Sequence, residues 1–202
     1  MANSNIQGFL NRIQNGVRPN LFQVDFSFPS GVAGLGTDIG EVTSVLCKAA
    51  ALPASNLGVI EVPFRGRTVK IAGDRTFDTW TATFINDSNF AIRTAMEKWM
   101  DAINKHERNT ADIYNPGEGG TANRKYTADL IVRQLARDES VSGRTLTGYK
   151  LWGCFPTNIS QIDLAYDSND QIEDFTVEFQ LQYWTRGEAS TYDSVIAGQA
   201  GA

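Results

Sequence analysis

Histidine and cysteine are scarce in this chain of 202 residues, which contains one histidine and two cysteines. The cysteines, Cys47 and Cys154, stand far apart and outside any C-x-x-C pair, so neither a zinc site nor a disulfide framework is predicted. We expect both to be buried free thiols. The histidine, His106, lies at the polar end of an expected helix, where a capping role is sufficient to explain its presence. The sequence therefore offers no histidine-based catalytic set.

Long apolar runs and an excess of positive charge are also lacking. No stretch approaches the roughly 18 consecutive apolar residues of a membrane helix, and the start, MANSNIQGFL, lacks the basic and apolar regions of a signal peptide. We therefore expect no membrane anchor and a cytoplasm-like compartment. Lysine and arginine number 18 against 23 acidic residues, a net charge of −5. General affinity for nucleic-acid phosphates is not expected at this charge.

Three stretches are similar to ligand-binding loops but lack a decisive residue. The glycine-rich segment around Gly31, Gly34 and Gly36 is not followed by the amphipathic helix that a nucleotide-binding loop requires. The loop at 109–125 lacks the Gly-Lys-Ser/Thr ending of a phosphate-binding loop. The acidic stretch at 167–174 lacks the glycine and the bidentate glutamate of a calcium loop. We therefore predict no cofactor, no metal site and no enzymatic activity.

What the chain does contain is enough apolar sequence for one folded domain, with 42% hydrophobic residues. Residues 89–106 show helical spacing of apolar side chains and predict one long helix. Residues 4–15 predict a short amphipathic helix that is not stable alone, so it must pack on the body or on another subunit. Its apolar face consists of Ile6, Phe9, Leu10 and Ile13.

Most other segments alternate apolar and polar residues, which is typical of half-buried antiparallel strands. The strands are expected at 22–28, 44–52, 57–63, 67–73, 76–86, 126–137, 145–155, 161–166 and 172–184. Tight turns are expected at 73–75 and 167–170, where Gly, Asp and Asn favour them. Loops are expected at 29–43 and 109–125, and residues 185–202 form a C-terminal tail or an assembly arm. The predicted chain is thus mainly β, with one domain over 1–184.

Two of these strands have a polar side. In the last strand the apolar residues from Phe175 to Tyr183 alternate with a polar row, and the strand at 76–86 carries a second polar row. The first row is Thr176, Glu178, Gln180 and Gln182, and the second is Thr79, Thr81 and Thr83. By pattern alone these are solvent-facing positions of a sheet.

Several short segments, taken in order, resemble one known family. They are RPNLFQV at 18–24, AGDRTF at 72–77 with WT at 80–81, IVRQ at 131–134, ARD at 136–138, WGCFPTN at 152–158 and YDSN at 166–169. Together they resemble the tail tube proteins of bacteriophages with contractile tails, over about residues 18–184. The stretch at 29–43 and the residues after Trp184 are longer than the family pattern.

This resemblance implies a β-sandwich or partial barrel of two antiparallel sheets, with one flanking α-helix and the short N-terminal helix. It implies a virion protein whose hexameric rings stack into a tube, with sheath, baseplate and tail terminator proteins as partners. Double-stranded DNA would pass through the lumen without specific binding. About 24 strands at ~4.8 Å spacing and roughly 40° tilt give a backbone diameter near 48 Å, which is wide enough for a DNA duplex.

The resemblance also assigns roles to surface residues. We expect the two polar rows to line the lumen. We expect subunit or ring contacts at the N-terminal helix face and at Leu35, Ile39, Tyr192, Val195 and Ile196. Two alternatives stay open. One is the inner tube of a contractile injection system that delivers protein cargo. The other is an enzyme or sugar-binding module with a cleft between loops 29–43 and 109–125, for which the sequence supplies no catalytic group.

Overall fold

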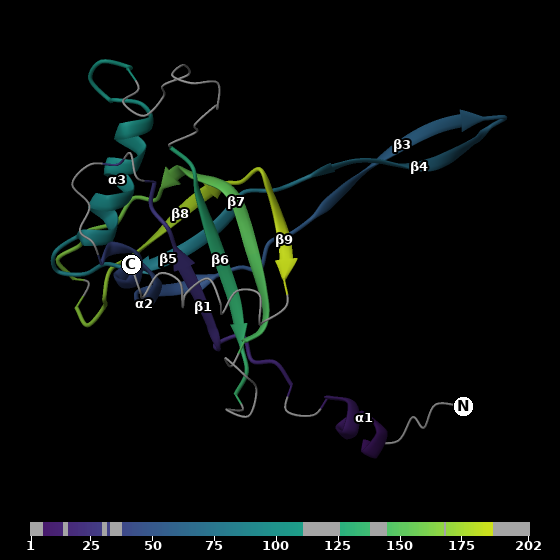
Figure 1. Cartoon of the computed structure of the whole chain (residues 1–202), viewed down its shortest axis with the longest axis horizontal. Helices are drawn as coiled ribbons and strands as arrows, with labels where there is room; N and C mark the ends of the chain where they lie inside the picture. The colour runs from purple at the N-terminus through teal and green to yellow at the C-terminus, as the bar shows by residue number, and fades with distance from the viewer. Residues whose placement is uncertain are drawn as a thin grey trace.

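The computed structural model describes residues 6–13, 16–29, 32, 38–110, 126–137, 145–167 and 169–187. Figure 1 shows the described chain as mainly β, as predicted. The helices are α1 (Ile6–Ile13), α2 (Ile39–Val45) and α3 (Ala91–Ile103). The strands are β1 (Phe22–Phe26), β2 (Cys47–Ala50), β3 (Asn56–Phe64), β4 (Arg67–Thr76), β5 (Trp80–Ile85), β6 (Ala128–Leu135), β7 (Thr145–Ile159), β8 (Asp174–Gln180) and β9 (Tyr183–Gly187).

Seven strands form an antiparallel arrangement of two layers that share β7. The strand order is β1-β6-β7-β8-β5-β2, and β9 also pairs with β7. The N-terminal part of β7 pairs with β6 and β9, whereas its C-terminal part pairs with β8. The backbone has a φ of +62° at Gly153, where a Cβ would lie 2.9 Å from the side chain of Gln182. The predicted sandwich or partial barrel is therefore confirmed, with β7 serving both layers.

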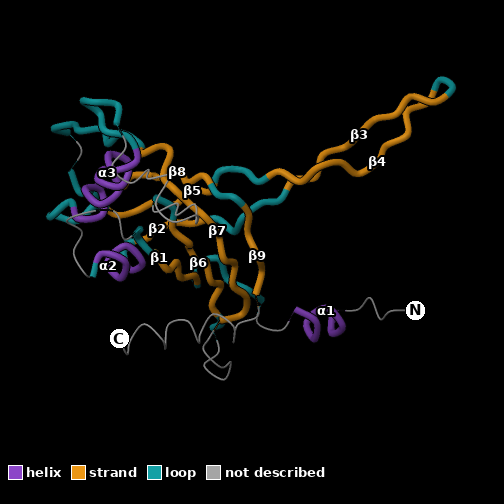
Figure 2. Tube along the Cα trace, turned by 45° about the horizontal axis from the view of Figure 1, so that its top comes forward, coloured by secondary structure: helices purple, strands orange, loops and turns teal. Residues whose placement is uncertain are grey.

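The core lies between the two layers and is rich in aromatic rings. Phe26 from one layer meets Phe84 and Phe179 from the other, with ring centroids 5.3 Å and 6.1 Å away. Helix α3 closes one open side of the sandwich, because the fully buried Trp99 packs on Phe179 at 6.2 Å. The Trp99 indole donates a hydrogen bond of 2.7 Å to the carbonyl of Tyr126. Figure 2 shows α2 and α3 on one side of the strands, while β3 and β4 extend from the other.

Helix α2 was not predicted. The sequence predicts a loop up to residue 43 and a strand at 44–52. Instead, α2 spans the junction between these two segments, and β2 is only four residues long. The helix packs closely on β1, because a Cβ at Gly40 would lie 2.7 Å from the carbonyl oxygen of Phe26. Thr43 is fully buried, and its hydroxyl donates to the carbonyl of Ile39 at 2.6 Å. This close packing, rather than local alternation, determines the helix.

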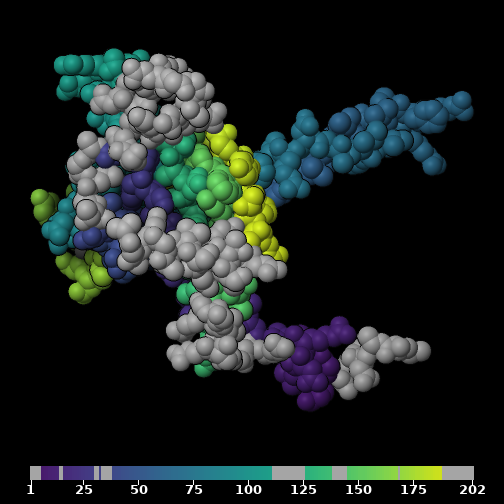
Figure 3. Space-filling view, in the orientation of Figure 1, coloured from purple at the N-terminus to yellow at the C-terminus, as the bar shows by residue number. Residues whose placement is uncertain are grey.

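Strands β3 and β4 form a separate hairpin, and the turn predicted at 73–75 is wrong. Strand β4 continues through these residues and ends at Thr76, and residues 77–79 then lead to β5. The real turn is at Arg65 and Gly66, whose φ values of +45° and +83° are typical of the two-residue turns that join hairpin strands. Gly73 instead allows close approach of the strands, since a Cβ there would lie 3.1 Å from the backbone of Gly58. Figure 3 shows the hairpin as an arm that projects from the body.

Three further boundaries differ from prediction. The long helix is shorter than 89–106, because α3 ends at Ile103 and His106 lies in the following turn. The segment 161–166 is not a strand, so 167–170 is not a hairpin turn. The last predicted strand is divided into β8 and β9 by the bend opposite Gly153. Among the described residues, none of the helices is both long and apolar enough to span a membrane.

Candidate assembly surfaces

The two predicted polar rows lie on one face, because β5 pairs with β8. Thr81 is opposite Glu178, and Thr83 is opposite Thr176. The hydroxyl groups of Thr83 and Thr176 are 3.1 Å apart and form a hydrogen bond. The alternate residues of both strands, such as Phe84, point into the core. Alternation therefore separates a dry side from a polar side on each strand.

The surface formed by Thr81, Thr83, Thr176, Glu178 and Gln180 is called the polar sheet face below. It extends onto the flanking strands of its layer, with Ala49 of β2 opposite Thr83 and Asn158 of β7 opposite Glu178. Two predicted members lie at its margin. Thr79 is exposed just before β5, and Gln182 is exposed in the bend between β8 and β9. At the start of β8 the ammonium of Lys48 is paired with the carboxylate of Asp174.

The outward face of the other layer has a different chemistry. The ammonium of Lys150 lies 3.6 Å from the ring centroid of Trp152, which stacks on Tyr183 with centroids 5.8 Å apart. A guanidinium nitrogen of Arg133 lies 2.7 Å from the carboxylate of Asp25, and the Arg133 side chain is 6% exposed. The ammonium of Lys150 also lies 3.1 Å from the carboxylate of Asp129, so both cations are ion-paired. This surface therefore carries aromatic rings and paired charges, where the polar sheet face carries hydroxyl, amide and carboxylate groups.

The β3–β4 hairpin has one apolar side, which sequence analysis did not single out. Cross-strand pairing places five apolar residues on the same side, and each of them is 42–61% exposed. These residues, called the hairpin apolar face below, are Ile60, Val62, Phe64, Val69 and Ile71. The opposite side carries the ion pair of Glu61 with Lys70, at 3.7 Å. An isolated two-stranded hairpin is marginally stable in water, so this ribbon needs a surface to cover it.

The predicted contact residues are only partly within the described structure. Helix α1 has no buried residue, and its apolar face is exposed at Ile6 (78%), Phe9 (63%), Leu10 (50%) and Ile13 (46%). In Figure 1 this helix lies apart from both layers. Ile39, the first residue of α2, is half-buried. The other predicted contacts, Leu35, Tyr192, Val195 and Ile196, lie outside the described residues.

The described residues contain no group of three or more His, Cys, Asp or Glu side chains arranged to hold a metal ion. Both cysteines are free; Cys154 is buried and Cys47 is half-buried. Burial raises the pKa of each thiol to about 12. The thiols are therefore protonated near neutral pH and are poor nucleophiles.

Comparison with known proteins places this chain among phage tail proteins. The sequence model of a family described as "Phage tail tube protein" matches residues 17–187. "Tail tube protein gp19" of Enterobacteria phage T4 is 36% identical over 167 residues, which cover 83% of this chain and 90% of that protein. "Tail tube protein" of Serratia phage KSP90 is 32% identical over 163 residues, covering 81% of this chain and 84% of the relative.

Solved structures share the fold at low sequence identity. One is titled "Cryo-EM structure of the anti-feeding prophage cap (AFP tube terminating cap)" and aligns with a TM-score of 0.58 at 18% identity, covering 87% of this chain and 93% of the other. The second, a "PVC sheath/tube terminator in extended state" of an extracellular contractile injection system, aligns with a TM-score of 0.54 at 12% identity, over 85% and 96% of the two chains.

Proposed function

Because this chain belongs to the phage tail tube protein family, we propose that its copies form hexameric rings that stack into the inner tube of a contractile tail, through which DNA passes. Family membership makes the chain a structural virion protein and not an enzyme, in agreement with the sequence analysis. The ring size, the passage of DNA and the partners of the tube are the parts that the proposal adds.

The hairpin apolar face is the observation that carries the assembly. Five apolar side chains lie on one side of a ribbon that projects from the body, and they remain about half exposed in one copy of the chain. Exposed apolar patches of this kind mark interaction surfaces. A subunit that meets identical copies along a tube buries such a ribbon at every repeat, which removes apolar area from water. The apolar side of α1 supports the same role.

The chemistry of the polar sheet face supports the proposal that this face lines the bore of the tube. Its layer contributes four strands, β2, β5, β8 and β7, and six copies would supply the roughly 24 strands that a bore wide enough for duplex DNA requires. Lys48, a cation near its edge, is already paired with Asp174. Proteins bind DNA phosphates mainly through lysine and arginine, so a wall of hydroxyl, amide and carboxylate groups has little affinity for the DNA backbone. The face of the other layer, with its aromatic rings and paired charges, is then the outer wall.

Sheath, baseplate and tail terminator proteins are the proposed partners of this outer wall and of the tube ends. Support comes from the fold that this chain shares with chains in the structures titled as a tube terminating cap and as a sheath/tube terminator. The alternative of an injection-system tube with protein cargo rests on that shared fold, whereas the curated relatives at 32–36% identity are phage tail tube proteins. The phage tail is therefore the better supported setting.

Cryo-electron microscopy of the purified protein tests the assembly. We expect six-fold rings and stacks of rings for the wild type. Two neighbouring residues of β4 give a matched pair of variants: Val69→Asp puts a charge on the hairpin apolar face, while Thr68→Asp puts the same charge on the opposite side. Val69→Asp should stay monomeric and Thr68→Asp should assemble. Wild-type protein that forms only monomers or closed two-fold dimers contradicts the proposal.

A further inference from the structure

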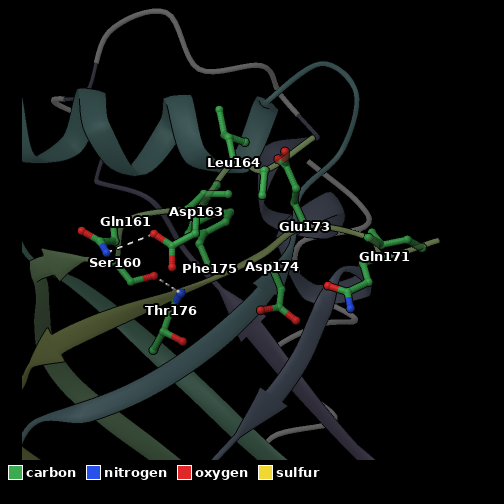
Figure 4. A pocket seen from close by; sticks show the side chains of 12 residues that line it. Ser160, Gln161, Asp163, Leu164, Gln171, Glu173, Asp174, Phe175 and Thr176 are labelled. Atoms are coloured by element: carbon green, nitrogen blue, oxygen red, sulfur yellow. Dashed lines mark hydrogen bonds between the residues drawn. The ribbon is translucent and has the colours of Figure 1, made fainter. Parts of the chain in front are cut away.

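A hollow of about 460 Å³ lies beside the start of β8, away from the polar sheet face centre. It is lined by residues 160–165 of the β7–β8 connection and by 171–176, which lead into β8. Figure 4 shows Leu164 and Glu173 pointing to one side of the hollow, while Asp174 and Thr176 point to the other. The hollow meets the polar sheet face at Thr176, but its other lining residues belong to none of the assembly surfaces described above.

The hollow combines negative charge with exposed apolar side chains. Residues 160–174 contain five carboxylates and no lysine or arginine. Within the same segment Leu164 is 81% exposed and Ile172 is 77% exposed, and Tyr166 is fully exposed. Two basic groups beside the segment are already engaged. Lys48 is paired with Asp174, and Arg93 contacts Glu97 at 2.9 Å and donates to the carbonyl of Ser160 at 3.2 Å. The segment is therefore an acidic surface with apolar side chains that face solvent.

The hairpin has the complementary character. Residues 56–76 contain four basic and two acidic residues, although the whole chain has a net charge of −5. Two of the four basic residues lie at the tip, where the guanidinium of Arg65 lies 5.4 Å from the ring centroid of Phe64 and Arg67 is the cross-strand partner of Phe64. Phe64 itself is 61% exposed. The tip thus presents one exposed aromatic ring together with two arginines.

The two surfaces lie at opposite ends of the molecule. In Figure 1 the hairpin extends to one end of the longest axis, and the β7–β8 connection lies at the other end, near α2. A copy therefore cannot place its own tip in its own hollow. Contact between these two different surfaces of two copies is head-to-tail, which is the type of contact that repeats along rings and helical stacks.

We propose that the hairpin tip of one copy docks in the acidic hollow of a second copy. Phe64 packs on the apolar side chains of the 160–174 segment, and Arg65 and Arg67 face its carboxylates. Asp163 lines the hollow, Asp167 follows the lining residues of the β7–β8 connection, and both are exposed. The proposal rests on the proposed function, namely that copies assemble. Helix α1 fits the tip less well, because its sequence IQGFLNRI has a basic residue and no carboxylate to pair with the guanidinium groups.

Charge reversal on each side tests this contact. One variant carries Arg65→Glu and Arg67→Glu at the tip, and the other carries Asp163→Lys in the hollow and Asp167→Lys beside it, both in the β7–β8 connection. All four side chains are exposed, so circular dichroism should show a native fold for both variants. We expect each variant alone to sediment as an assembly at least tenfold less than the wild type at the same protein concentration.

Restoration is the decisive readout. In a mixture of the two variants, the acidic tip of one variant meets the basic hollow of the other, and the native tip of the second meets the native hollow of the first. Both contacts join opposite charges, so we expect the mixture to recover wild-type assembly. A chain that carries all four substitutions has the wild-type net charge and should also assemble. If wild-type protein assembles and the single-sided variants do so equally well, or the mixture fails to recover, the docking contact is wrong while the proposed function stands. If wild-type protein does not assemble, both are wrong.

Discussion

Truncation of one hairpin side chain, Ile60→Ala, separates assembly from folding. Ile60 is 53% exposed in the single copy. Burial of a whole isoleucine side chain is worth about 1.5–3 kcal/mol, so covering the exposed half is worth about 1 kcal/mol. The variant should therefore raise the critical concentration for assembly about fivefold, since a factor of ten corresponds to about 1.4 kcal/mol. Its free energy of unfolding should change little, because the hairpin lies outside the core.

The matched control for this prediction is Ile92→Ala. Ile92 lies on α3 and is fully buried in the core, where loss of an isoleucine side chain costs about 2–5 kcal/mol of folding stability. Sedimentation across a concentration series measures the critical concentration, and urea unfolding followed by circular dichroism measures stability. An Ile60→Ala protein with an unchanged critical concentration, or with a stability loss equal to that of Ile92→Ala, would refute the reasoning.

Three further outcomes are expected. Gly40→Ala should lower the free energy of unfolding by about 1–3 kcal/mol in urea titrations, because its methyl group would lie 2.7 Å from the carbonyl oxygen of Phe26; an unchanged midpoint would mean that α2 does not pack on β1 in this way. Burial raises the pKa of the Cys154 thiol from 9.0 to about 12, so the folded chain holds this proton more tightly than the unfolded chain. The stability that this provides is complete below pH 9 and is lost as the pH rises toward 12, so alkaline unfolding curves of Cys154→Ala should fall less steeply with pH than those of the wild type. Glu178→Lys, which adds a cation to the polar sheet face, should slow DNA ejection from phage particles most strongly at low salt, whereas Glu178→Gln should not; equal rates for both would argue against a bore on this face.

Alternation in the sequence was sufficient to find the polar sheet face but not its neighbours. Alternation of apolar and polar residues assigned Thr81, Thr83, Thr176 and Glu178 to the solvent-facing sides of their strands. The pairing of β5 with β8 joins these residues into one surface. Pairing depends on contacts between residues almost a hundred positions apart, which no local pattern contains. For the same reason α2 was missed, because its position depends on the approach of Gly40 to β1.

The hairpin shows where composition misleads. Gly73, Asp74 and Arg75 are typical turn residues, yet they lie within β4, because Gly73 serves the close approach to Gly58. The signal for the real turn was the residue pair at 65–66, a glycine preceded by a polar residue between two alternating runs. The apolar side of the ribbon was visible in the same alternation, but a pattern does not tell whether a partner strand, the core or a second copy covers it.

The location of the polar sheet face in an assembled tube tests the account most directly. Glu178→Cys and Tyr183→Cys place a reactive thiol on the polar sheet face and on the outward face of the other layer. The native thiols label slowly, because burial raises the pKa of both to about 12. With a maleimide gold cluster and cryo-electron microscopy of tubes, the account predicts density inside the bore for Glu178→Cys and on the outer wall for Tyr183→Cys. Gold on the outer wall for Glu178→Cys would contradict it.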